Sequence, residues 1–367
     1  MATTQRNRYY SLNKILSFKA DYNLIIGERS NGKTYAVLKY CIGQYAKSGK
    51  KFVYIRRWKE DIIGKRGEVI FTSLVKNGEI AKATNGEYTH CILQSGKFYF
   101  ANYDDKLKKF IPASDYFCHL VSLSDMEHDK SLSFHGVENI VFDEFLTRRY
   151  YLKDEFMIFM NVLSTIIRDR KNVKIFMLGN TVIEYCPYFP ELGINVDTLK
   201  QGNVDLYHYG DSELTLAIEY CDDNTRTNKE SNKYFAFNNP RLNMITKGAW
   251  EMDIYPHLPV GYKIASDNII FTFFIEFHGK IIQGDVVQDK KNIFIFFHIK
   301  TTEIRDKDKA LIYSTQNNIN INYRKNVIRG VGKLENKINL LFVMNKVFYQ
   351  SNEIGEIVHN YLLQANN

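Results

Sequence analysis

Two glycines and a lysine-threonine pair stand close together near the N-terminus. Residues 27–34 are Gly-Glu-Arg-Ser-Asn-Gly-Lys-Thr and match the pattern GxxxxGK[ST] at every fixed position. Glycines let the backbone wrap closely around a phosphate, and the start of a following helix adds a favourable dipole. The segment therefore predicts a phosphate-binding loop in which Lys33 reaches the β- and γ-phosphates and Thr34 binds Mg²⁺. An ordinary glycine turn is the alternative. The expected nucleotide contacts are Gly27, Glu28, Arg29, Ser30, Asn31, Gly32, Lys33, Thr34 and Tyr35, although Arg29 could instead face solvent or a neighbouring subunit.

Two adjacent carboxylates end an apolar segment further along the chain. Residues 140–142 are Ile-Val-Phe, and Asp143 and Glu144 follow them. At a strand end, Asp143 can hold Mg²⁺ through water while Glu144 orients or deprotonates the attacking water. An exposed Asp-Glu pair is often only structural, but its place behind an apolar strand and downstream of the loop favours catalysis. The two segments together predict hydrolysis of a nucleotide.

Further polar side chains follow other predicted strands. Asn180 comes directly after the apolar segment 173–179 and could sense the γ-phosphate or the water, or its Gly-Asn pair could simply form a turn. Arg56 and Arg57 end the segment 51–57. One of them could touch phosphate, base or Glu144, and the other is expected to be solvated.

Cations also stand near the end of a predicted helix. Arg168 and Arg170 follow residues 154–167 and could complement the helix C-terminus. The other interpretation of Arg168 is an arginine finger that completes the nucleotide site of a neighbouring subunit, which requires a ring. Lys130 could serve the same interface, or could be a solvated loop lysine. Lys106, Lys108 and Lys109 form a small basic cluster that suits a DNA backbone or water equally well.

The elements that must position these residues alternate between strands and helices. Apolar segments at 23–26, 51–57, 138–145 and 173–178 predict strands, and apolar spacing after Gly32 and over 154–167 predicts helices. Alternation over 91–103 predicts a hairpin. Continuously apolar strands separated by helices are typical of a mainly parallel sheet covered on both faces. We therefore expect a doubly wound α/β domain over residues 1–200.

The length of 367 residues suits more than one domain. Residues 201–250 are more polar and predict a linker or a small connecting subdomain. Strand-like segments at 268–277, 280–287 and 292–300, with a helical pattern over 337–363, predict a smaller α+β domain over residues 251–367.

Composition narrows the class of protein. The net charge of +8 favours a polyanionic partner such as nucleic acid, although many basic proteins never bind one. The five cysteines are odd in number and include no CxxC pair, so neither a disulfide framework nor a zinc site is indicated, and a reducing cytosol is expected. The start of the sequence has no apolar secretory segment and no apolar stretch is long enough for a membrane span, so we expect a soluble protein without a membrane partner.

Five segments, in this order, resemble one family: IIGERSNGKTYA, FVYIRRWK, VENIVFDEF, STIIRDR and KIFMLGN. They are similar to the DNA encapsidation proteins, the genome-packaging motor ATPases of small tailed bacteriophages that replicate by protein priming. The resemblance covers roughly residues 10–190. It implies a RecA-like P-loop ATPase of the additional-strand, catalytic-glutamate class that uses ATP and Mg²⁺. It further implies a homomeric ring, a pentamer in this family, that drives double-stranded DNA into a prohead in the host cytoplasm while transiently attached to it.

The resemblance also implies roles for single residues. Arg168 corresponds to a trans-acting arginine, Lys130 less securely to a trans-acting lysine, and Arg56 or Arg57 to the arginine after the second strand. The family's C-terminal domain resembles an RNase H nuclease that has lost its metal carboxylates, and it docks on the portal (connector) or on a structural packaging RNA.

Two points stay open in the sequence. Asp267, Glu276, Asp285 and Glu303 are the available carboxylates of the C-terminal domain, and we expect them to be solvated strand and turn residues. The rival functions are a nucleotide-gated nucleic-acid-binding assembly protein with little turnover and another P-loop enzyme such as a kinase.

Overall fold

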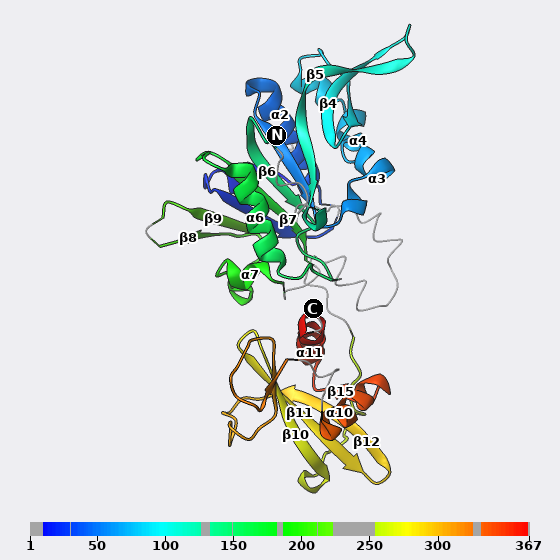
Figure 1. The fold of residues 1–367 in the computed structure, drawn as a ribbon, viewed down its shortest axis with the longest axis vertical. Helices are drawn as coiled ribbons and strands as arrows, with labels where there is room; N and C mark the ends of the chain where they lie inside the picture. Colours follow the sequence, from blue (N-terminus) through cyan, green and yellow to red (C-terminus); the bar gives the residue numbers. More distant parts are fainter. Residues whose placement is uncertain are drawn as a thin grey trace, which may run out of the picture. The chain divides into compact units, whose positions relative to one another are not determined.

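The computed structural model describes residues 10–29, 31–125, 133–148, 150–181, 186–210, 212–222, 254–325 and 332–365. The chain divides into two units, Met1–Trp250 and Glu251–Asn367. Each unit is built on a sheet of its own. Figure 1 labels the elements of both units.

The first unit is built on a nine-stranded sheet in the order β3-β4-β5-β2-β6-β7-β1-β9-β8. The neighbours from β5 to β9 pair in parallel, whereas β3, β4 and β8 pair antiparallel at the two edges. The predicted mixed α/β fold with a mainly parallel sheet is therefore confirmed. The strands are β1 (Tyr22–Gly27), β2 (Lys51–Arg56), β3 (His90–Gln94), β4 (Lys97–Asp104), β5 (Lys109–Ser122), β6 (Val137–Asp143), β7 (Lys174–Asn180), β8 (Val204–His208) and β9 (Thr215–Tyr220).

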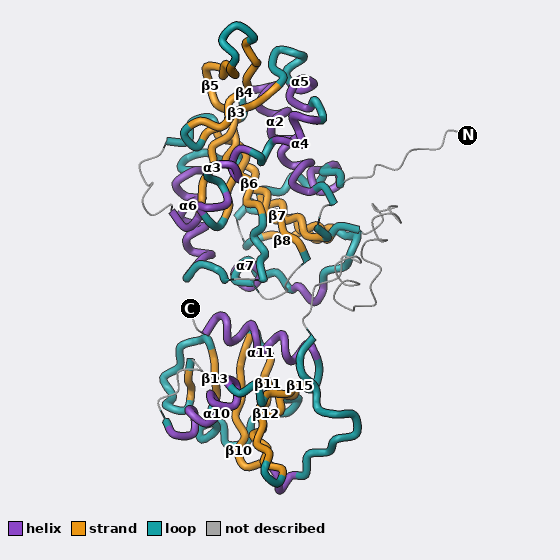
Figure 2. Tube along the Cα trace, turned by 90° about the vertical axis from the view of Figure 1, so that its right-hand side faces the viewer, coloured by secondary structure: helices purple, strands orange, loops and turns teal. Residues whose placement is uncertain are grey.

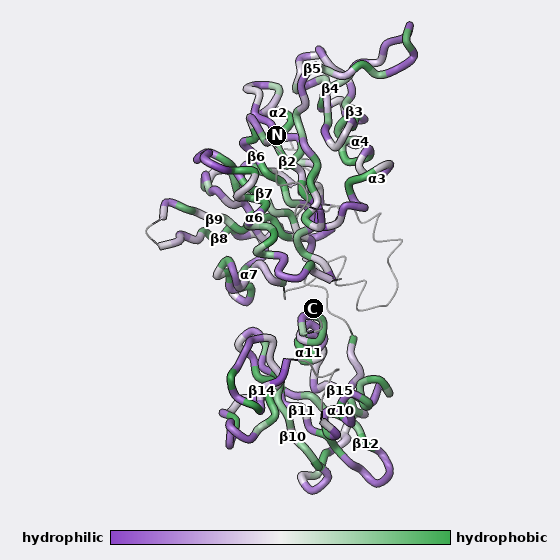
Figure 3. The backbone as a smooth tube through the Cα atoms, viewed as in Figure 1, coloured by the Kyte–Doolittle hydropathy of each residue, from purple (hydrophilic) through white to green (hydrophobic). Residues whose placement is uncertain are grey.

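Helices cover both faces of this sheet, which is why its central strands are apolar along nearly their whole length (Figure 3). In Figure 2, α2 and α4 lie on one side of the strands and α6 on the other. The buried side chains accordingly form two clusters, one on each face. The helices are α1 (Asn13–Leu16), α2 (Lys33–Ser48), α3 (Gly64–Glu68), α4 (Thr72–Lys76), α5 (Glu79–Ala83), α6 (Glu155–Ile167) and α7 (Tyr188–Glu191), with short 3₁₀ turns η1 (Lys59–Asp61), η2 (Leu123–Asp125) and η3 (Val196–Thr198).

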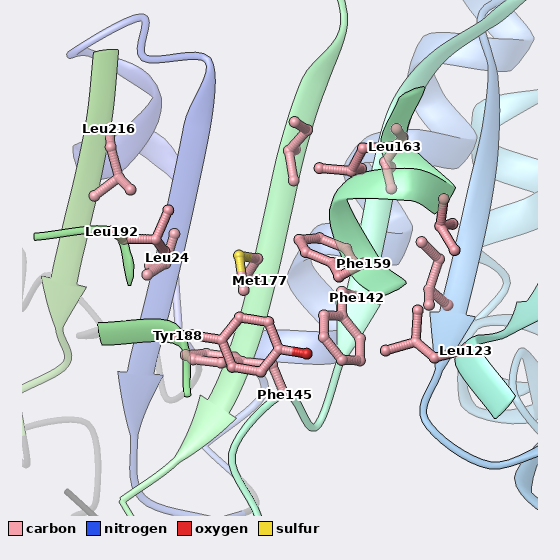
Figure 4. Close-up of a cluster of buried hydrophobic side chains, with 14 of the residues drawn as sticks. Leu24, Leu123, Phe142, Phe145, Phe159, Leu163, Met177, Tyr188, Leu192 and Leu216 are labelled. Atoms are coloured by element: carbon pink, nitrogen blue, oxygen red, sulfur yellow. The ribbon is translucent and has the colours of Figure 1, made fainter. Parts of the chain in front are cut away.

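Helix α6 packs on the sheet through aromatic side chains (Figure 4). The ring of Phe159, on α6, lies 5.0 Å from that of Phe142, on β6, and Tyr188 packs edge-on against both. All three rings are fully buried. Aromatic pairs of this kind stabilise the packing beyond the effect of burying apolar area, so they hold α6 in place against the end of β6.

The sheet of the first unit continues beyond residue 200, where we expected the first domain to end. Strand β9 pairs in parallel with β1, and β8 pairs with β9, so residues 204–220 complete the sheet instead of linking two domains. The polar sequence around these strands hides them, because β8 is an edge strand whose side chains are only partly buried. The rest of the expected linker, residues 223–250, lies outside the described residues.

The second unit has a six-stranded sheet in the order β14-β13-β10-β11-β12-β15. The three strands predicted from the sequence, β10, β11 and β12, form an antiparallel meander. The helical tail predicted over 337–363 is interrupted by β15, which pairs with β12. The elements are η6 (Ser266–Asn268), β10 (Ile269–Phe277), β11 (Lys280–Asp289), β12 (Asn292–Ile299), β13 (Ile312–Ser314), β14 (Tyr323–Arg324), α10 (Lys333–Val343), β15 (Val347–Tyr349) and α11 (Asn352–Ala365).

The carboxylates in the described part of the second unit do not converge on one point. Among the described residues, no group of three or more His, Cys, Asp or Glu side chains is placed to hold a metal ion. Asp267 and Glu303 are exposed and Glu276 is partly buried. Asp285 is buried, contrary to expectation, and accepts hydrogen bonds from Thr272, Gln283 and His298 at 2.7, 2.9 and 3.0 Å.

None of the helices in the described ranges is both long and apolar enough to cross a membrane.

Candidate functional site

The predicted phosphate-binding loop joins the end of β1 to the start of α2. Gly32 has a φ of 93°, a left-handed conformation that glycine adopts without strain. Gly27 is needed for a different reason, because a Cβ atom there would lie 2.7 Å from the Cβ of Cys221, just beyond β9. The two glycines therefore serve separately, one for the turn of the loop and one for its close packing against β9.

A pocket of about 660 Å³ opens beside this loop, within the usual size range of ligand sites. It lies at the carboxyl ends of β1, β2, β6 and β7, which is where open α/β sheets bind ligands. Its walls are Arg29, Asn31, Gly32, Lys33, Thr34, Tyr35, Arg56, Arg57, Trp58, Asp61, Asp143, Glu144, Leu146, Thr147, Arg148, Leu178, Gly179 and Asn180. Most residues predicted from the sequence thus meet in one cavity. Trp58, Asp61 and Arg148 were not predicted.

Lys33 is buried among oxygen atoms at the base of the pocket. Its Nζ lies 2.6 Å from the carbonyl oxygen of Glu28, 3.1 Å from that of Gly27 and 3.3 Å from Oδ1 of Asn180. Phosphate oxygens are the same kind of acceptor with a full negative charge, so they would form stronger hydrogen bonds to this ammonium group. Asn180 therefore lies beside the position where a terminal phosphate would contact Lys33.

Thr34 and Asp143 face each other across the pocket floor. Oγ1 of Thr34 lies 3.2 Å from each carboxylate oxygen of Asp143. Asp143 also accepts a hydrogen bond from the hydroxyl of Tyr54 at 2.7 Å. Mg²⁺ prefers such hard oxygen ligands, usually one or two from protein together with phosphates and water. The two side chains therefore fit a magnesium site, and Tyr54, which the sequence analysis missed, orients the carboxylate.

Glu144 follows Asp143 in a left-handed backbone conformation, with a φ of 58°. Its Oε2 lies 2.6 Å from NH2 of Arg56. Partial burial raises the pKa of Glu144, and the positive charge of Arg56 partly offsets that rise. Arg29 lines the same pocket as Glu144, and its positive charge also lowers the pKa of Glu144. Arg29 thus belongs to the pocket of its own chain.

Arg57 differs from the prediction that the second arginine is solvated. Only 4% of it is exposed, and its guanidinium forms a bidentate ion pair with Glu155 at 2.7 and 2.9 Å. Its other nitrogen contacts are the carbonyl oxygens of Glu144 and Phe145. The sequence could not reveal this, because the partner carboxylate comes 98 residues later in the chain. In this arrangement the donors of Arg57 are used by protein and do not point to a phosphate.

Arg168 is exposed at the end of α6 and does not line the pocket. Helix α6 begins beside the end of β2, where Glu155 meets Arg57, and a short connection after it leads to the start of β7. Its thirteen residues span about 20 Å. Arg168 therefore lies toward the amino ends of the strands, whereas the pocket of its own chain lies at their carboxyl ends.

The remaining cations and loop residues that were predicted from the sequence lie in different surroundings. Arg170 donates to the carbonyl oxygens of Ile166, Ile167 and Phe134, so it caps its own helix. The hydroxyl of Tyr35 contacts Glu79 at 3.2 Å, near the outer part of the pocket. Lys130 and Ser30 lie outside the described residues.

The relatives found by comparison with known proteins agree with one another. Residues 4–232 match the family model described as Podovirus DNA encapsidation protein (Gp16). The DNA packaging proteins of Bacillus phages phi29 and PZA are each 27% identical over 227 residues, which is 60% of this chain and 60% of those proteins. The match thus spans about three fifths of the length of these relatives.

A solved structure shares the fold over a longer range. The bacteriophage Phi-29 viral genome packaging motor assembly contains a chain that superposes with a TM-score of 0.58 and 18% identity, covering 98% of this chain and all of that one. At this level of identity the likeness concerns the fold alone. Because the family model covers more than half of the sequence, the chain belongs to the podovirus DNA encapsidation protein (Gp16) family.

Proposed function

We propose that this chain is the ATPase of a DNA-packaging motor, which binds ATP with Mg²⁺ and couples hydrolysis to translocation of double-stranded DNA into a prohead. One observation carries the proposal: the lysine, the Thr34–Asp143 pair and Glu144 converge on one pocket at the carboxyl edge of a parallel sheet. Membership of the encapsidation family and the names of its relatives support the same function.

The pocket residues divide the chemistry among them. Lys33 and the N–H groups at the start of α2 bind the phosphates. Thr34 and Asp143 would hold Mg²⁺, which neutralises phosphate charge when bound. Glu144 orients and deprotonates the attacking water, for which it must exchange the guanidinium of Arg56 for a water molecule. Asn180, in contact with Lys33, senses the terminal phosphate from the end of β7.

The motor works as a homomeric ring, with five subunits expected from the family resemblance. The position of Arg168 supports this, because the residue is exposed at the end of α6 that lies away from the pocket and is not among the residues that line the pocket of its own chain. A cation there would stabilise the charge that develops during phosphoryl transfer. Lys130 is proposed for the same interface.

The second unit is proposed to be an RNase H-like domain without nuclease activity that docks on the portal (connector) or on a packaging RNA. The strand order β12-β11-β10-β13-β14, with the first three strands antiparallel, supports the fold. The lack of a carboxylate cluster among the described residues supports binding over cleavage. The protein would act in the host cytoplasm while transiently attached to the prohead.

The test is Glu144→Gln in the full chain, which keeps the shape of the side chain and removes the base. We expect unchanged MgATP affinity and a loss of hydrolysis and packaging of about 10²- to 10⁴-fold. Glu138→Gln, at the other end of the same strand and paired with Lys50, is the matched control and should hydrolyse normally.

Two other results would each favour a rival. Binding of MgATP without appreciable hydrolysis by the unmodified protein, so that Glu144→Gln changes nothing, would favour an assembly protein that only binds nucleotide. Transfer of the γ-phosphate to a small acceptor, without stimulation by double-stranded DNA, would favour a kinase.

A further inference from the structure

Arg57 and Glu155 form a buried ion pair directly behind the catalytic loop. Their exposed fractions are 4% and 1%, and two nitrogen-oxygen contacts of 2.7 and 2.9 Å join them. The guanidinium also lies over the ring of Tyr151, 4.8 Å from its centroid. Burying two charges costs solvation energy, and apolar residues of similar size often stabilise a fold as well or better. Stability alone therefore does not explain the pair.

The rest of the guanidinium holds the loop that presents the catalytic carboxylate. Arg57 donates to the carbonyl oxygen of Glu144 at 3.1 Å and to that of Phe145 at 2.7 Å. From the other side, the Phe145 N–H donates to the carbonyl oxygen of Leu178 on β7. Between these contacts Glu144 has its left-handed backbone, which costs a residue with a side chain about 1–2 kcal/mol. The contacts of Arg57 are well placed to hold this conformation.

Glu155 in turn fixes Arg57. Its carboxylate accepts from the Leu152 N–H at 2.8 Å and from the Tyr188 hydroxyl at 2.6 Å, so the pair is braced by two further elements. Glu155 is also the first residue of α6, where a negative charge complements the helix dipole. The guanidinium is therefore held by a rigid helix start in the aromatic core.

We propose that Arg57 is a positioning residue for ATP hydrolysis: anchored by Glu155, it holds the Glu144 and Phe145 carbonyls and thereby directs the Glu144 side chain at the attacking water. The inference rests on the proposed function, in which Glu144 activates that water. Arg57 touches no substrate in this role. Its effect is on the rate of the chemical step and not on nucleotide binding.

Arg57→Lys in the full chain separates the two parts of this role. A lysine can keep one contact with Glu155, but its single ammonium group cannot also hold both carbonyls in the forked geometry of arginine. We expect kcat to fall about 10- to 100-fold, because a small misplacement of a catalytic group is costly, while KM for MgATP changes less than about twofold. In a Glu144→Gln background the same substitution should cause no further loss, since Arg57 acts only through Glu144.

Glu155→Gln is the second variant, in case Arg57→Lys folds poorly. It keeps the shape of the anchor and removes its charge, so kcat should fall by a smaller factor, again at constant KM. Arg324→Lys is the matched control. Arg324 also pairs with a glutamate, Glu335, at 3.2 Å and contacts backbone carbonyls, but it lies in the second unit, and its substitution should not change kcat.

Three results would overturn the inference. They are an unchanged kcat in Arg57→Lys, an equal further loss in the Glu144→Gln background, and a Glu155→Gln protein with a lower melting temperature but normal kcat. Failure of the proposed function looks different, because Glu144→Gln itself would then retain turnover.

Discussion

Arg56 lies between the carboxylates of Asp143 and Glu144 and contacts them unequally. Its NH2 group is 2.6 Å from Oε2 of Glu144, whereas its NH1 group is 3.7 Å from Oδ2 of Asp143. Burial and the neighbouring carboxylate of Asp143 raise the pKa of Glu144, and the positive charge of Arg56 lowers it. Arg56 thus favours the ionised form of Glu144, and in the proposed mechanism their ion pair must open for water to reach the carboxylate.

Removal of this cation should make hydrolysis more sensitive to acid. Partial burial already raises the pKa of Glu144, and Arg56→Ala removes the charge that offsets it, so the pKa should rise further. Because Glu144 acts in its ionised form, the acid limb of kcat/KM against pH should move to higher pH. Arg56→Lys keeps a charge and should shift it less. Acid limbs that coincide for all three proteins would contradict this account of Arg56.

The packing of Gly27 predicts a loss of nucleotide affinity that a second substitution repairs. In Gly27→Ala the new Cβ would lie 2.7 Å from the Cβ of Cys221, so the loop must shift, and we expect MgATP affinity to fall at least tenfold. Cys221→Gly removes the opposing atom and should restore part of the affinity, measured by titration with a fluorescent ATP analogue.

Gly43→Ala is the control for this prediction. Gly43 lies inside α2 with no atom within 4 Å of a Cβ added there, so alanine should stabilise the helix by about 1 kcal/mol and leave affinity unchanged. Equal affinities for Gly27→Ala and the unmodified protein would show that the loop tolerates the contact.

The central part of the fold and site could be predicted because it depends on local signals. The loop, the apolar strand before Asp143 and the segment before Asn180 are each legible in a few consecutive residues, and the rule that parallel strands end at one edge brings them together. The partners of Arg57 and Tyr54 depend on contacts across the sheet, which a single sequence does not encode locally. Strand β8 was not predicted from the sequence for a related reason, since an edge strand with one solvent-exposed face has only a weak pattern of apolar residues.

The pair of buried Asp285 and half-buried His298 should make the second unit less stable at alkaline pH. The hydrogen bond that His298 donates to Asp285 raises the pKa of His298 despite its partial burial. Burial alone would raise the pKa of Asp285, but its hydrogen-bond donors lower it overall. The contribution of His298 to the free energy of unfolding is complete below the pKa of a histidine in the unfolded chain, about 6.5. It is lost as pH rises through the higher pKa that His298 has in the folded protein. The contribution of Asp285 to the free energy of unfolding is present above about pH 4, and it is lost as pH falls through the lower pKa that Asp285 has in the folded protein.

His298→Gln should therefore destabilise the protein at pH 5.5, by about 1 kcal/mol, and much less at pH 9. Denaturant unfolding of the full chain at the two pH values measures the difference. A destabilisation that is equal at both would show that the loss comes from packing against Phe296, whose ring stacks on His298, and not from charge.

The position of Arg168 predicts that two inactive proteins become active when mixed. Arg168→Ala has an intact pocket but no finger, and should hydrolyse ATP at least about 10³-fold more slowly. Glu144→Gln has an intact finger but no base, and its hydrolysis should fall about 10²- to 10⁴-fold. In a mixed ring, an Arg168→Ala pocket can meet the arginine of a Glu144→Gln neighbour, and equal mixing should restore up to about a quarter of full turnover. Arg170→Ala is the contrast, because Arg170 caps its own helix. That variant should lose stability, and mixing it with Glu144→Gln should add nothing beyond its own activity. If mixing Arg168→Ala with Glu144→Gln restores no turnover at protein concentrations that saturate assembly, then Arg168 does not act across subunits.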